Sequence, residues 1–140
     1  MISDSSSADV INWPEALRSV DGDVDLLRVV AQAVLTEAGE QEQRLAAAIA
    51  FGDAETVHRL GHLLNGVLST FEATACRIPA ERLEHMGRLA DLSDAAGSFQ
   101  EFQAQFQKVR EALTAFVEGR FNPMSGSGTA LSGRPIGEGC

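Results

Sequence analysis

Apolar residues in this chain recur every three or four positions, which is the period of an α-helix and not of a β-strand. In the segment 99–116 the steps between them are three, four, three, four and three, a seam typical of helices packed side by side. The apolar residues of this seam are Phe99, Phe102, Phe106, Val109, Leu113 and Phe116. No sustained alternation of apolar and polar residues is present, and helix-forming residues dominate. The sequence therefore predicts an all-α fold.

Capping and turn residues divide this pattern into one short helix and four longer ones. Asn12 and Asp53 are expected N-caps, because their side chains can accept hydrogen bonds from the first helical turn. Pro79 and Ser98 are expected to open the last two helices. The expected helices span residues 13–21, 23–51, 54–74, 79–93 and 98–118. Joined by short turns, the four longer helices pack most simply as an antiparallel four-helix bundle, with the short N-terminal helix as an extra element.

The predicted core lies on the apolar stripes of these helices. We expect Cys76 to be a helix-end or core thiol, and the segment 79–93 to offer several side chains for burial. Those side chains are Leu83, Met86, Leu89, Ala90 and Leu92. The residues most firmly expected to be buried are Leu60, Leu64, Leu68, Phe102, Phe106 and Val109.

Composition sets the domain plan and argues against several partners. Residues 1–9 are polar and 120–140 are rich in Gly and Ser, so both ends are expected to be disordered around one helical domain, residues 10–119. The net charge of −9 argues against nucleic acid and against an anionic membrane as partners. No apolar run is long enough to span a membrane. Two cysteines make no disulfide framework, so we expect a cytoplasmic protein. We also expect it to be a monomer.

The segment 56–71 carries the functional signal. Its apolar stripe defines one face of a helix, and the opposite face is expected to hold His58, His62, Asn65, Gly66 and Ser69. A glycine within a helix costs about 1 kcal/mol relative to alanine, so an exposed Gly66 needs a reason. Keeping the space beside His62 open for a bulky group is such a reason. The second glycine of the segment, Gly61, lies near the apolar stripe and could let two helices approach closely.

Simpler interpretations of these residues remain open. A single exposed histidine on a helix is usually an ordinary surface residue. His58 and His62 lie four residues apart and could bind a metal from one face, with Glu55 as a third ligand, but two or three ligands make a weak metal site. The sequence shows no Gly-rich phosphate loop, no Ser/His/Asp arrangement and no convincing carboxylate pair. Arg59 is the only charged residue between positions 56 and 71, so this face suits a partner with an acidic pocket.

The residues at 62–66, His-Leu-Leu-Asn-Gly, followed by Phe-Glu-Ala at 71–73, resemble a known signature. It is the His-x-Leu-Lys-Gly-Ser/Ala…Leu-Gly-Ala pattern of histidine-containing phosphotransfer (HPt) domains. The flanking segments that resemble this family are 10–17, 22–28, 46–53 and 82–84. The sequence departs from the pattern at three positions: Asn65 replaces the usual Lys, Val67 a small residue, and Glu72 the usual Gly.

The resemblance implies that His62 accepts a phosphoryl group from the aspartate of a response-regulator receiver domain and passes it on. Arg59, His58, Asn65, Gly66 and Ser69 are the expected supporting residues, with Arg59 a candidate for replacing the charge of the missing lysine. Imidazole suits the task because it is largely neutral and nucleophilic at pH 7. The expected partners are receiver domains, a hybrid sensor histidine kinase, or both.

The resemblance further implies a phosphocarrier in a bacterial two-component system, and not an enzyme with kinase or ATP-binding parts. No cofactor of its own is expected, because the receiver supplies the Mg²⁺. The alternative, suggested by Asn65 and Glu72, is a binding module of the same fold that docks a receiver or kinase without phosphotransfer.

Overall fold

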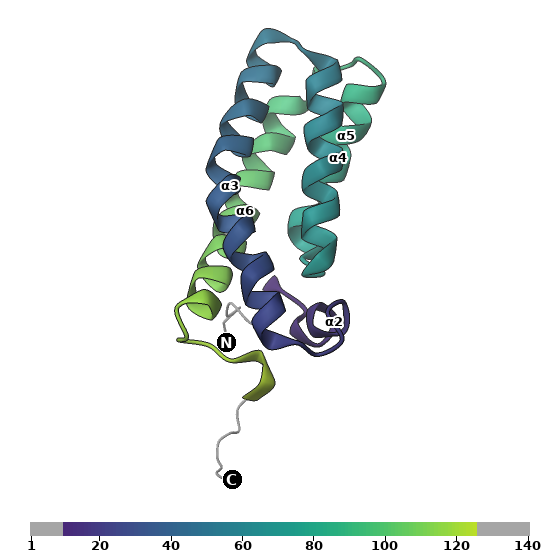
Figure 1. Ribbon diagram of the computed structural model, residues 1–140. Helices are drawn as coiled ribbons and strands as arrows, with labels where there is room; N and C mark the ends of the chain where they lie inside the picture. Colours follow the sequence, from purple (N-terminus) through teal and green to yellow (C-terminus); the bar gives the residue numbers. More distant parts are fainter. Residues whose placement is uncertain (1–9, 126–140) are drawn as a thin grey trace, which may run out of the picture.

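The computed structural model describes residues 10–125, which form an all-α bundle with no strand (Figure 1). The short helix α2 spans Trp13–Arg18, and the 3-10 helix η1 spans Pro123–Ser125. The long helices are α3 (Val24–Phe51), α4 (Ala54–Thr70), α5 (Thr74–Arg88) and α6 (Ala95–Val117). In the bundle, α3 packs against α4 and α6, and α5 packs against the same two helices. The predicted fold class is therefore confirmed.

Local sequence explains where the first helices begin. The Asn12 side chain accepts a hydrogen bond from the backbone N–H of Glu15 at 3.2 Å, and so caps α2 as predicted. Asp53 caps α4, because its carboxylate accepts from the backbone N–H of Thr56 at 3.2 Å and from the Thr56 hydroxyl at 2.6 Å. These hydrogen bonds hold the pKa of Asp53 below its ordinary value. The cap fixes the start of the helix that carries His62.

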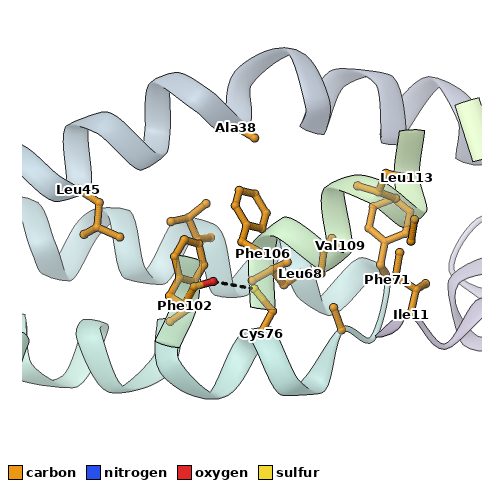
Figure 2. Close-up of a cluster of buried hydrophobic side chains, with 14 of the residues drawn as sticks. Ile11, Ala38, Leu45, Leu68, Phe71, Cys76, Phe102, Phe106, Val109 and Leu113 are labelled. Atoms are coloured by element: carbon orange, nitrogen blue, oxygen red, sulfur yellow. Dashed lines mark hydrogen bonds between the residues drawn. The ribbon is translucent and has the colours of Figure 1, made fainter. Parts of the chain in front are cut away.

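The core runs along the centre of the bundle and contains the predicted apolar seam (Figure 2). Every residue of the 99–116 seam is buried, and so are Leu60, Leu64 and Leu68 of α4. Cys76 lies in this core as expected, with its thiol 4.0 Å from the backbone oxygen of Phe102. Burial raises the pKa of the Cys76 thiol to about 12.

Trp13 closes one end of the bundle. Its ring contacts the rings of Phe71, Phe116 and Phe121, with centroids 6.4, 5.0 and 5.0 Å apart. Phe121, which contacts Trp13, lies in the segment 120–140 that was expected to be a disordered tail. The rest of that tail, 126–140, and the expected disordered segment 1–9 lie outside the described residues.

The predicted start of α5 was wrong. Pro79 was expected to open this helix, but α5 begins at Thr74 and contains Pro79 in its second turn. A proline inside a helix removes one hydrogen bond at a cost of about 3 kcal/mol. Pro79 is buried between Cys76 and Ala80, which are themselves buried, so packing of this turn offsets the cost.

Four other predicted helix boundaries were also wrong. Helix α2 ends at Arg18 and not at residue 21. Helix α4 ends at Thr70 and not at residue 74, because Glu72 adopts a positive φ of 50° that ends the helical path. Helix α5 ends at Arg88, so Leu89 and Ala90 lie in the following turn and are exposed instead of buried. Helix α6 begins at Ala95, and Ser98, the expected cap, is buried inside it.

Candidate functional site

His62 stands on the exposed face of α4. Its side chain is 75% exposed, as predicted for a residue that a partner must reach. A Cβ built on Gly66, one turn further along, would meet nothing within 4 Å. The surface beside the imidazole is therefore open, and the predicted exposure of both residues is confirmed.

Glu84 of α5 holds the imidazole of His62 in a defined state. Its carboxylate oxygen Oε2 lies 3.0 Å from Nδ1 of His62, and the Glu84 side chain is only 16% exposed. An ionised carboxylate can only accept a hydrogen bond, so Nδ1 must carry the proton. In the neutral imidazole the other ring nitrogen, Nε2, then keeps its lone pair. The geometry selects Nε2 as the nucleophilic atom of His62.

Two glycines bring α4 and α5 close enough for this contact. A Cβ on Gly61 would lie 2.7 Å from the backbone nitrogen of Glu84, and a Cβ on Gly87 would lie 2.4 Å from the backbone nitrogen of His58. Only glycine permits such an approach of two helix backbones. The expected role of Gly61 in close helix packing is confirmed, and its consequence is to place Glu84 beside His62.

His58 is turned toward α5 instead of toward solvent. Its Nδ1 lies 3.2 Å from the backbone oxygen of Glu84, a group that only accepts, and the side chain is half-buried. His58 thus anchors the same residue that contacts His62. Among the described residues, no group of three or more His, Cys, Asp or Glu side chains is placed to hold a metal ion. Glu55, the third ligand considered above, is exposed on α4.

Asn65 and Ser69 of α4 are half-buried. The Ser69 hydroxyl donates its proton to the backbone oxygen of Asn65 at 2.9 Å, within α4. The Asn65 side-chain oxygen accepts a hydrogen bond from Nε of Arg77 at 3.2 Å. Arg59 lies apart from this group, exposed on the side of α4 that faces α3, where its Nη2 donates to the Thr56 hydroxyl at 3.3 Å.

Comparison with known proteins places the chain in a family. The model of the Hpt domain matches residues 29–112, which is more than half of the chain. The chain belongs to the Hpt domain family. No curated protein and no solved structure matches it significantly. Hpt domains are phosphocarrier modules, not kinases, and they act in histidine phosphotransfer with receiver domains and kinases. Within residues 10–125 no helix is long and apolar enough to cross a membrane.

The sequence did not identify Glu84 and Arg77 as residues of the site around His62. Both come from α5, seven positions apart and therefore on one face of that helix. The seven-residue spacing was visible in the sequence, but the register of α5 against α4 was not. That register depends on the contacts at Gly61 and Gly87, which only the structure supplies.

Proposed function

We propose that His62 is the phosphoryl acceptor of this Hpt domain and that its Nε2 atom takes part in the transfer. The observation that carries the proposal is the contact between Nδ1 of His62 and the carboxylate of Glu84, beside an open glycine surface. The contact leaves one nitrogen of an exposed ring with a free lone pair. A buried or symmetrically bonded histidine would have no such atom to offer.

The chemistry follows from this arrangement. In the proposed step Nε2 attacks the phosphorus of a receiver aspartyl phosphate in line, and the N–P bond forms as the bond from phosphorus to the carboxylate oxygen breaks. The aspartate leaves as a carboxylate with the electron pair. The imidazole ring, which keeps its proton on Nδ1, becomes a cation, and the adjacent Glu84 carboxylate stabilises that charge. The step is reversible, so the same ring can donate the group to a second receiver.

The surface around His62 suits a protein donor. Leu63, the next residue along α4, is 46% exposed and borders an apolar groove between α3 and α4. Other apolar residues of this groove are Val30, Val34 and Val67, with Phe106 among the lining residues. Gly66 keeps the other side of the ring clear. In this proposal the Mg²⁺ and the acidic residues that handle the phosphoryl group belong to the receiver.

The test uses receiver domains charged with acetyl phosphate. Wild-type protein should acquire an acid-labile label, and His62→Gln should acquire none while keeping its fold. Gly66→Leu should also fail to take label from the receiver, because the added side chain fills the space that the partner needs. Its stability should stay level or rise by up to about 1 kcal/mol, since glycine within a helix is penalised. Labelling that persists in His62→Gln would contradict the proposal.

The second candidate function is docking without transfer. Asn65, which lacks the charge of the lysine usual at this position, is the observation that favours it. Tight binding of a charged receiver with no label on wild-type protein would support this candidate over the first.

A further inference from the structure

A positively charged side chain of α5 is bonded to α4 three residues after His62. Arg77 of α5 reaches Asn65 of α4, and its Nε donates to the amide oxygen at 3.2 Å. Asn65 lies three residues after His62, about 60° round the same helix. Its side chain tilts back toward the start of α4, in the direction of His62. This hydrogen bond therefore ties Arg77 to the side of α4 that carries His62.

The bonding of Arg77 leaves its phosphate-binding atoms free. Only Nε is used, and within residues 10–125 neither terminal nitrogen of Arg77 has a hydrogen-bond or ion-pair partner. The other two arginines of α5 already have partners: Arg82 pairs with Glu101 at 2.9 Å, and Arg88 contacts His85 at 2.7 Å. A guanidinium presents two parallel N–H donors that match two phosphate oxygens. A half-buried Arg held at one end with this fork open is arranged to bind an anion.

We propose that Arg77 binds the phosphoryl group on His62 and that Asn65 is the residue that positions it. The inference rests on the proposed role of His62 as acceptor. It also accounts for Asn65 chemically, because an amide oxygen can hold a guanidinium by accepting a hydrogen bond, whereas an ammonium at this position would repel it. Glu84 and Arg77 then stabilise different groups: Glu84 stabilises the imidazolium, and Arg77 stabilises the phosphoryl oxygens.

The experiment uses phosphoramidate, a small donor that needs no partner protein. Nε2 attacks its phosphorus, the N–P bond to the ring forms, and the bond to the amine breaks. The amine leaves as ammonia after taking a proton from solvent. Peptide mass spectrometry follows the labelling of His62 over time. The exposed His85 of the same protein is the internal reference for the reactivity of phosphoramidate toward histidine.

Arg77→Met should slow labelling of His62 by about tenfold and leave His85 unchanged. This is less than the loss of a donor in a closed active site, because the site is open to water. Adding Asn65→Lys to Arg77→Met should restore most of the rate, since the ammonium then stands one turn from His62. Arg82→Met is the matched control on the same helix and should label at the wild-type rate. Circular dichroism confirms that each variant folds.

Two results would overturn the inference. One is an Arg77→Met protein that labels His62 at the wild-type rate. The other is a slow Arg77→Met protein that Asn65→Lys fails to restore, since Arg77 would then act through packing alone. Failure of every receiver to transfer to a wild-type protein that phosphoramidate labels normally would instead contradict the proposed function, and leave the role of Arg77 intact.

Discussion

At the scale of single residues, the two nitrogens of the His62 ring have different surroundings. Nδ1 faces the carboxylate of Glu84 at 3.0 Å, whereas Nε2 has no hydrogen-bond partner among residues 10–125, and the side chain is mostly exposed. His58, four residues earlier, also presents Nδ1 to Glu84, but to its backbone oxygen. The sequence identified His62 and Gly66, because their spacing on one helix is enough to define a face. It did not identify Glu84, because that contact depends on a second helix.

Substitution of Glu84 tests what the carboxylate does. Glu84→Gln keeps an oxygen that can accept from Nδ1, so phosphorylation should stay on Nε2, but the phosphorylated ring loses its counter-charge and the rate should fall. Glu84→Ala removes the acceptor as well, so the rate should fall by at least about tenfold and some phosphate should appear on Nδ1. Labelling kinetics with phosphoramidate measure both effects. A Glu84→Ala protein that labels like wild type would show that the carboxylate has no role in the reaction.

At the scale of helices, the site exists because α4 and α5 approach more closely than ordinary side chains allow. Gly61 and Gly87 make that approach possible, from one helix each. Periodicity predicted each helix and its buried face. It misplaced the end of α4 and the starts of α5 and α6, which lie at Thr70, Thr74 and Ala95. Those ends depend on tertiary packing and on the positive φ of Glu72, neither of which leaves a clear local signal.

Gly61→Ala should separate the two helices. The added Cβ would lie 2.7 Å from the backbone nitrogen of Glu84, so α5 must shift and the contact to His62 must lengthen. We expect a loss of about 1–3 kcal/mol in the free energy of unfolding, as for other overpacked interiors, together with slower labelling of His62. Gly97→Ala is the control, because a Cβ there meets nothing within 4 Å and the change should stabilise α6 slightly. Equal stability of Gly61→Ala and wild type would contradict the account of this contact.

At the scale of the whole molecule, one continuous core supports the exposed site. Apolar side chains from all four long helices fill it (Figure 2). Trp13 of α2 closes one end. The spacing of apolar residues predicted most of this core, because the apolar stripe of each helix is visible in that helix's own sequence. The contact of Phe121 with Trp13 was missed, since a lone aromatic residue after a helix has no periodic partners in the sequence.

Cys76 reports on the integrity of that core. Burial, and secondarily the charge of Glu42, raises the pKa of its thiol from 9.0 to about 12. The unfolded chain therefore releases this proton at a lower pH than the folded one. Its contribution to stability is fully present below about pH 9 and is lost as the pH rises from there toward 12. Urea unfolding across this range should show a steeper loss of stability for wild type than for Cys76→Ala. Parallel curves would mean that the thiol is not buried in the native state.

The central claim is that Nε2 of His62 carries the phosphoryl group. Two-dimensional phosphorus–nitrogen NMR on nitrogen-labelled protein, phosphorylated by a charged receiver domain, tests it most directly. The account predicts a single phosphorus signal coupled to Nε2 of His62, absent from His62→Gln. Phosphorus coupled to Nδ1 of His62, or to a ring nitrogen of His58 or His85, would contradict it.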